Sequence, residues 1–172
     1  MLDKGYIQVY TGNGKGKTTA ALGIALRAVC AGNRVFIGQF MKGQNYSELK
    51  CVDLLPCIEI EQFGDVGFVH GKPSEEDVAK AQKGLSRMKD ALSSGDYDVV
   101  IFDEINTSIF FGMVSVGDVL SALDMKPDNT EVILTGRKAC QEIIERADLV
   151  TEMREIKHYY NDGVPARKGI EN

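Results

Sequence analysis

Short apolar runs alternate along this chain with longer stretches of helical periodicity, and this alternation restricts the fold more than any other feature. The runs at residues 99–102 and 132–134 are apolar throughout, as expected for strands that helices cover on both faces. Strands that alternate with helices are the sign of βαβ units closing a parallel sheet. The pattern therefore predicts an α/β fold with a mostly parallel central sheet of about six strands.

The same periodicity predicts the individual elements. Strands are expected at residues 6–10, 34–39, 58–63, 98–102, 131–135 and 149–153. Helices are expected at residues 17–31, 46–54, 74–93, 116–125 and 139–146. In the longest of these helices one apolar stripe predicts packing on the sheet; it consists of Val78, Ala81, Leu85, Met88 and Leu92. Residues 64–73 and 159–172 are expected to be loops.

Length and charge limit the class of protein. A chain of 172 residues with 44% hydrophobic residues can bury one substantial core, so residues 1–172 are expected to form a single domain. The formal net charge of -5 argues against binding nucleic acid or anionic lipid by charge alone. No apolar run is long enough to span a membrane, and the first residues lead directly into a strand. We therefore expect a cytoplasmic protein without nucleic-acid or membrane partners.

A glycine-rich segment links the first expected strand to an alanine-rich helix. Strand, glycine loop and helix in this order are typical of phosphate binding, because backbone N–H groups and the helix amino terminus face the anion. Lys17 would add a mobile cation and Thr18 a hydroxyl for Mg²⁺. The first glycine lies one place later than in G-x-x-x-x-G-K-[ST], so a chance match is the alternative. The residues predicted to bind the triphosphate of Mg-ATP are Gly12, Asn13, Gly14, Lys15, Gly16, Lys17, Thr18 and Thr19.

The buried run at residues 98–102 ends in two carboxylates, Asp103 and Glu104. Acidic side chains at such a strand end hold Mg²⁺ opposite the phosphate loop of many nucleotide sites. Asp103 is the preferred metal ligand, directly or through water, together with Thr18. Glu104 is a second candidate for the ion, or a group that orients a water or contacts the ribose. The alternative is a solvated strand end without a ligand.

Six segments taken together make the sequence recognisable. They are residues 11–21, TGNGKGKTTAA; 103–106, DEIN; 135–137, TGR; 147–153, ADLVTEM; 157–158, KH; and 168–171, KGIE. In this order they resemble the ATP:corrinoid adenosyltransferases of the cob(I)alamin type, found in bacterial vitamin B12 synthesis and salvage. The resemblance extends over nearly the whole chain, and the shifted first glycine belongs to this family's version of the loop.

The resemblance implies a P-loop NTPase-like (RecA-like) three-layer sandwich and a specific reaction. Cobalt(I) of a reduced corrinoid attacks the 5′ carbon of ATP and displaces inorganic triphosphate. The phosphates would then be the leaving group, held by Lys17, Mg²⁺ or Mn²⁺, and backbone N–H groups. No general base is needed.

The resemblance also implies roles for residues outside the phosphate loop. Phe68 matches the first of two aromatic residues that lie against the corrin, and His70 stands where a tryptophan is usual. A phenylalanine packed in the core and a solvated loop histidine are the alternatives. Arg27, Asn106 and Arg137 match polar positions that contact nucleotide or corrinoid, although surface salt bridges would also explain the arginines.

The expected partners are ATP, a reduced corrinoid, a flavoprotein as reductant and a second copy of the chain, because the family forms dimers. Two other functions are compatible with the phosphate loop. A P-loop ATPase or small kinase would release orthophosphate or phosphorylate an acceptor, and a corrinoid carrier or nucleotide sensor would bind without turnover.

Overall fold

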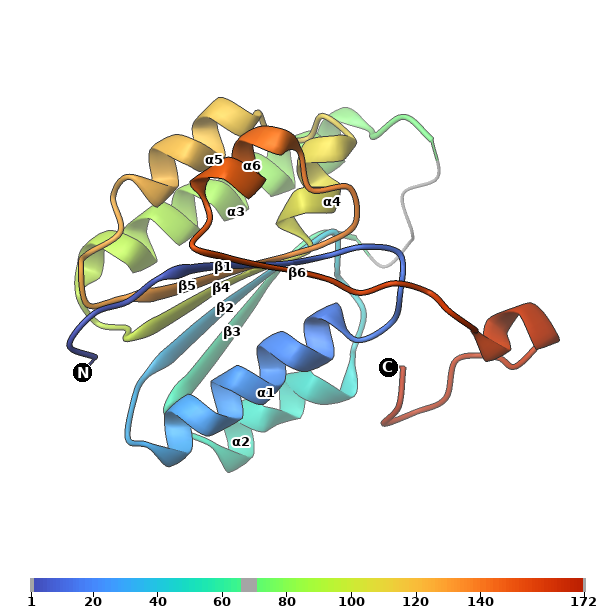
Figure 1. The fold of residues 1–172 in the computed structure, drawn as a ribbon, viewed down its shortest axis with the longest axis horizontal. Helices are drawn as coiled ribbons and strands as arrows, with labels where there is room; N and C mark the ends of the chain where they lie inside the picture. The colour runs from blue at the N-terminus through green and yellow to red at the C-terminus, as the bar shows by residue number, and fades with distance from the viewer. Residues whose placement is uncertain (1, 66–70, 172) are drawn as a thin grey trace.

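The computed structural model describes residues 2–65 and 71–171, and in this part of the chain six strands form one parallel sheet (Figure 1). The strands are β1 (Ile7–Thr11), β2 (Val35–Phe40), β3 (Ile58–Phe63), β4 (Val99–Asp103), β5 (Glu131–Thr135) and β6 (Leu149–Glu152). Their order across the sheet is β3-β2-β4-β5-β1-β6, and every neighbouring pair is parallel. The predicted α/β fold is therefore confirmed, with an entirely parallel sheet.

Helices cover both faces of this sheet (Figure 1). On one face lie α1 (Lys17–Cys30) and α2 (Cys51–Leu54). On the other lie α3 (Glu75–Ser94), α4 (Ile105–Phe110), α5 (Val116–Leu123) and α6 (Gln141–Arg146). Two 3₁₀ turns, η1 (Ser47–Lys50) and η2 (Tyr159–Asp162), complete the described elements. The result is the expected three-layer sandwich.

Each central strand supplies side chains to two separate hydrophobic cores. In β4, Val100 and Phe102 belong to the core beneath α3, α5 and α6, whereas Val99 and Ile101 belong to the core beneath α1. Successive side chains of a strand point to opposite faces, so both sets are buried only when both faces are covered. This is the physical reason why the run at residues 99–102 is apolar throughout.

The long helix α3 agrees closely with its prediction because its two ends carry strong local signals. Ser74 accepts a hydrogen bond from the backbone N–H of Asp77, whose side chain accepts from the N–H of Ser74, which forms a capping box. Gly95 ends the helix with a φ of 72°. At 20 residues α3 is the longest described helix, and none of the described helices is long and apolar enough to cross a membrane.

Two helices differ from the sequence-based prediction, and the 3₁₀ turn η2 lies within residues 159–172, which were expected to be a loop. The single helix expected at residues 46–54 is a 3₁₀ turn, η1, followed by the one-turn helix α2. Helix α4 was not predicted at all. It is short, and it begins after Glu104, whose left-handed φ of 63° and lack of a side-chain cap give no conventional start signal.

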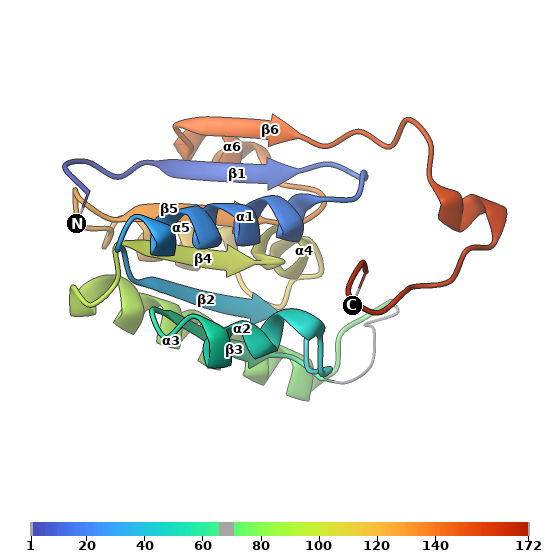
Figure 2. The same ribbon diagram turned by 90° about the horizontal axis from the view of Figure 1, so that it is seen from below.

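The strand order brings the chemistry-bearing segments to one edge of the sheet. Because all strands are parallel, their carboxyl ends lie together, and the chain after β6 extends beyond the same edge (Figure 2). Strand β5 lies between β1, which leads into the glycine loop, and β4, which ends at Asp103. The end of β5 therefore separates the two segments that the sequence marked for phosphate and metal.

Candidate nucleotide-binding site

Glycines are needed in the phosphate loop because the backbone at Met153 packs directly against it. Gly12 and Gly16 have φ of 95° and 117°, in the region that favours glycine. A Cβ atom on Gly12 would lie 2.4 Å from the carbonyl oxygen of Met153, and one on Gly14 would lie 2.8 Å from it. The N–H of Gly14 donates to that same oxygen over 2.7 Å, and the N–H of Met153 donates to Thr11 over 2.8 Å. The segment after β6 thus forms the floor of the loop.

Lys17 is the first residue of α1, and its side chain folds back onto the loop. Its Nζ donates to the carbonyl oxygens of Gly12 and Gly14, each over 2.8 Å. Burial lowers the pKa of Lys17, and the nearby Glu104 carboxylate opposes that shift. Since an ammonium group has three donors, Lys17 retains one for an anion in the loop.

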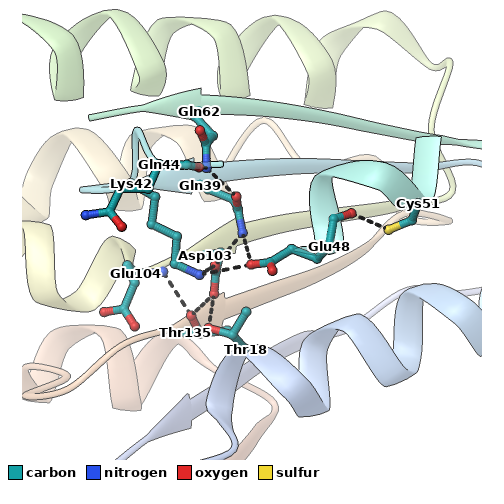
Figure 3. A network of polar contacts seen from close by, with 10 residues as sticks. All are labelled: Thr18, Gln39, Lys42, Gln44, Glu48, Cys51, Gln62, Asp103, Glu104 and Thr135. Atoms are coloured by element: carbon teal, nitrogen blue, oxygen red, sulfur yellow. Dashed lines mark hydrogen bonds and ion pairs between the residues drawn. The ribbon is translucent and has the colours of Figure 1, made fainter. Parts of the chain in front are cut away.

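Asp103 is the centre of a buried polar network (Figure 3). Its Oδ1 accepts hydrogen bonds from the hydroxyls of Thr18, at 2.8 Å, and Thr135, at 2.7 Å. Its Oδ2 accepts from Lys42 Nζ at 2.8 Å and from Gln39 Nε2 at 3.2 Å. One carboxylate therefore connects the start of α1 to the ends of β2 and β5.

The network continues away from Asp103 through Gln39 and Glu48. Gln39 Nε2 also lies 3.2 Å from Glu48 Oε1, and Gln62 Nε2 donates to Gln39 Oε1 over 3.1 Å. Lys42 Nζ lies 3.7 Å from Glu48. Burial alone would lower the pKa of Lys42, but the two carboxylates and above all Asp103 raise it. Lys42 is therefore an ammonium held between two carboxylates.

Glu104 is turned away from this network. Its backbone N–H donates to the hydroxyl of Thr135 over 2.9 Å, and its carboxylate accepts from the hydroxyl of Thr107 over 2.6 Å. Figure 3 shows its carboxylate pointing away from Asp103. The hydroxyl of Thr18 and the carboxylate of Asp103 are the hard oxygen donors that Mg²⁺ prefers. No cluster of three His, Cys, Asp or Glu side chains occurs within residues 2–65 and 71–171, so further ligands would come from phosphate and water.

Of these groups, Thr18, Lys42, Glu48 and Glu104 line a cleft of about 620 Å³, whereas Asp103 is buried and is not among the described lining residues. The predicted residues that line it are Asn13, Gly14, Lys15, Gly16, Lys17, Thr18, Thr19, Glu104 and Arg137. Gly12 contributes its carbonyl oxygen to Lys17. Arg27 is exposed in the last turn of α1 and is not among the described lining residues.

Asn106 is also absent from this lining. It is buried in α4, and its amide has no hydrogen-bond partner among the described residues. Phe68 and His70 lie outside the described residues.

The carboxyl-terminal segment forms one wall of the cleft, with His158, Ala166, Gly169, Ile170 and Glu171 among its lining residues. Lys15 Nζ donates to the carbonyl oxygen of Ile170 over 3.2 Å and lies 3.4 Å from Glu171. The carboxylate of Glu171 also accepts hydrogen bonds from Tyr159 and Arg167. This segment was expected to be a loop, but its contact with the phosphate loop was not predicted.

Sequence reasoning missed five polar residues of the network: Gln39, Lys42, Glu48, Gln62 and Thr135. Gln39 interrupts an otherwise apolar strand, which is an available signal because a buried amide needs partners. Thr135 lies in a segment that marks the family, but its position between Asp103 and the N–H of Glu104 depends on the strand order.

Known proteins resemble this chain at two levels. A solved structure, the flagellar accessory protein FlaH from Methanocaldococcus jannaschii, is similar in fold, with a TM-score of 0.61. It is 14% identical over 88% of this chain and 72% of its own, so it supports the fold alone.

Relatives by sequence are much more similar. A corrinoid adenosyltransferase from Escherichia coli K12 and the corrinoid adenosyltransferase CobA from Salmonella typhimurium LT2 are each 36% identical, over 98% of this chain and 86% of their own length. The family model described as ATP:corrinoid adenosyltransferase BtuR/CobO/CobP matches residues 3–172. The chain therefore belongs to the ATP:corrinoid adenosyltransferase family.

Proposed function

We propose that this chain holds ATP in the cleft so that the 5′ carbon faces cobalt(I) of a reduced corrinoid and the triphosphate is the leaving group. The observation that carries this proposal is the cleft itself, which Lys17 and Thr18 of the phosphate loop line and where the hydroxyl of Thr18 donates to the buried Asp103, in a chain of this family. Cobalt(I) donates an electron pair to form the cobalt–carbon bond. The bond between C5′ and oxygen breaks, and its electrons leave with the triphosphate.

The phosphate loop stabilises the negative charge that grows on the leaving oxygen. The N–H groups at the start of α1 and the remaining donor of Lys17 face the triphosphate. Cobalt(I) carries no proton that must be removed, so no general base is assigned. Holding C5′ in line with cobalt supplies the other part of the acceleration.

A divalent cation, Mg²⁺ or Mn²⁺, is also part of this proposal. The oxygen donors of Thr18 and Asp103 fit such an ion, and triphosphate oxygens and water would complete its coordination. When bound, the ion supplies positive charge beside the leaving group. The carboxylate of Glu104 accepts a hydrogen bond from Thr107, so we assign Glu104 to contact the divalent cation through a water molecule.

The remaining residue roles stay proposals. Phe68 and His70 are assigned to the corrin, and Arg137 to the nucleotide or corrinoid from its place in the cleft lining. Asn106 and Arg27 are assigned to contact the nucleotide or the corrinoid, as the resemblance implies. A homodimer, a flavoprotein reductant and a cytoplasmic location complete the proposal.

Turnover in the dark tests the function. The protein is incubated with ATP, Mg²⁺ and chemically reduced cobalamin, and we expect a light-sensitive adenosylated corrinoid and an equal amount of inorganic triphosphate. Lys17→Ala should lower the rate about 100-fold, as expected for loss of a charge-stabilising donor. Lys50→Ala, which removes an exposed lysine outside the cleft, is the control.

The phosphate product separates the alternatives. Orthophosphate without an adenosylated product would indicate an ATPase, and tight binding of both ligands without any product would indicate a carrier or sensor. Either result, obtained with folded protein, would overturn the proposal.

A further inference from the structure

Lys42 lies in the cleft although it belongs neither to the phosphate loop nor to the segments that mark the family. It is the second residue after β2, and its Nζ contacts Asp103 Oδ2 while the hydroxyl of Thr18 contacts Oδ1. One carboxylate thus bridges Lys42 and the proposed metal-binding hydroxyl. A counter-ion on Oδ2 competes with a metal ion for the same oxygen.

The backbone of Lys42 is fixed, whereas its side chain is long and flexible. Met41 has a left-handed φ of 57°. A Cβ atom on Gly64 would lie 2.5 Å from the backbone nitrogen of Lys42, and one on Gly43 would lie 2.5 Å from the carbonyl oxygen of Gly64. Such close packing leaves the backbone little freedom. A four-carbon side chain with a three-donor head group can nevertheless change partners by rotation.

The surroundings of the ammonium offer several partners within a short reach. It lies 3.7 Å from Glu48 and 5.2 Å from the ring centroid of Tyr46, and both of these residues line the cleft. Gln39 Nε2 also donates to Asp103 Oδ2. Asp103 therefore keeps the amide of Gln39 and the two threonine hydroxyls as donors if Lys42 moves away.

The charges of the cleft favour such a movement when ATP binds. Its lining side chains are nearly balanced, with cations at Lys15, Lys17, Lys42 and Arg137 and carboxylates at Glu48, Glu104 and Glu171. A triphosphate adds several negative charges, and the oxygen Oδ2 cannot bind a divalent cation and an ammonium at the same point. A charge-assisted hydrogen bond to the triphosphate would replace the one that Lys42 gives up when it leaves Asp103.

We propose that Lys42 is a second phosphate-binding lysine, whose ammonium moves from Asp103 to the triphosphate of ATP when Asp103 takes part in binding the divalent cation. This inference rests on the proposed function. The leaving group is then held by Lys17 from the loop and by Lys42 from the end of β2. Without ATP, the contact with Asp103 holds the ammonium of Lys42 at the cleft in which the triphosphate would bind.

Calorimetry with inorganic triphosphate at saturating Mg²⁺ measures this role without a corrinoid. Lys42→Met should weaken triphosphate binding about 10-fold or more, because a charge-assisted hydrogen bond is lost. Lys42→Arg should recover most of the affinity. The matched control is Lys50→Met, which removes the same charge from an exposed position outside the cleft and should bind as the unaltered chain does. Unchanged affinity of Lys42→Met would overturn the proposal, since a lysine that only neutralises Asp103 is not needed once metal is saturating.

Affinity labelling of the unaltered chain gives a second test that does not depend on the folding of a variant. An ATP derivative with an acyl group on its terminal phosphate acylates amines that contact the phosphates. Peptide mass spectrometry should find the label on Lys42 as well as Lys17, and excess inorganic triphosphate should suppress both. Label on Lys17 but not on Lys42 would contradict this inference and leave the proposed function intact. Absence of an adenosylated product would contradict the proposed function instead.

Discussion

At the scale of single residues, Asp103 shows what sequence can and cannot reveal. Its place after an apolar strand and the lysine–threonine pair of the loop are local patterns, so the link between Asp103 and Thr18 could be anticipated. The contribution of Thr135 could not, because it depends on β5 lying between β1 and β4. Its hydroxyl donates to Asp103 and accepts from the N–H of Glu104, which holds the site together before any ligand binds.

Replacing Thr135 by valine tests this role, since valine keeps the shape and removes the hydroxyl. The free energy of unfolding should fall by about 1–3 kcal/mol, because a buried carboxylate loses a donor and a partly buried N–H loses its acceptor. Urea denaturation followed by circular dichroism measures the change. Ser121→Ala removes an exposed hydroxyl on α5 and should change stability by less than about 0.5 kcal/mol. Equal effects of the two substitutions would mean that Thr135 has no special role.

At the scale of elements, those with local sequence signals could be predicted, whereas those held by tertiary contacts could not. Helix α3 carries its own capping box and terminal glycine, so its limits follow from the sequence. The carboxyl-terminal segment carries no periodic pattern, and its attachment to Lys15 through Ile170 and Glu171 depends on the fold. This attachment makes the segment a wall of the cleft.

We expect Glu171→Gln to loosen that wall. Hydrogen bonds from Arg167 and Tyr159 hold the pKa of Glu171 well below its usual range. A lowered carboxyl pKa means that the stabilising contact contributes fully above the ordinary value, about 4.3, and is lost progressively as pH falls below it toward the lowered pKa. Amide exchange of residues 164–171 in the unaltered chain should therefore keep its protection as pH is lowered to about 4.3 and lose it gradually below that value, beyond the intrinsic pH dependence.

In Glu171→Gln the same amides should exchange up to about 5-fold faster at neutral pH, as expected for partly exposed ionic contacts. Exchange mass spectrometry localises the effect. Glu145→Gln on the exposed surface of α6 is the matched control and should leave these amides unchanged. A segment that exchanges equally fast in both variants would not be held by Glu171.

At the scale of the whole molecule, the alternation of apolar runs and helices was sufficient to predict a sheet of about six strands whose centre is covered by helices, whereas the three-layer sandwich was implied by the family resemblance. Burial on two faces leaves a clear record in composition, as β4 shows. Strand order leaves no such record, so the proximity of β6 to the phosphate loop was not foreseeable. That proximity explains the glycines at residues 12 and 14, which the sequence connects only with phosphate.

A pair of glycine-to-alanine substitutions tests whether the packing of the segment after β6 requires glycine at residue 12. Gly12→Ala should lower the free energy of unfolding by about 2 kcal/mol, because its φ is 95° and its Cβ would meet the Met153 carbonyl oxygen. Gly23→Ala, within α1 and with open space around it, should raise it by about 0.5–1 kcal/mol. Denaturant titration of both variants provides the measurement. A Gly12→Ala variant with an unchanged free energy of unfolding would show that the segment after β6 can move to make room for the added methyl group.

The crossing of Met153 over the phosphate loop bears on the order in which the chain is made. Gly14 leaves the ribosome early, whereas the carbonyl group that accepts its N–H is added long afterwards. A nascent chain that has completed only β1 and α1 already contains the whole glycine-rich motif but lacks the floor that shapes it. The hydrogen bond that completes the phosphate loop can therefore form only after β6 has been synthesised.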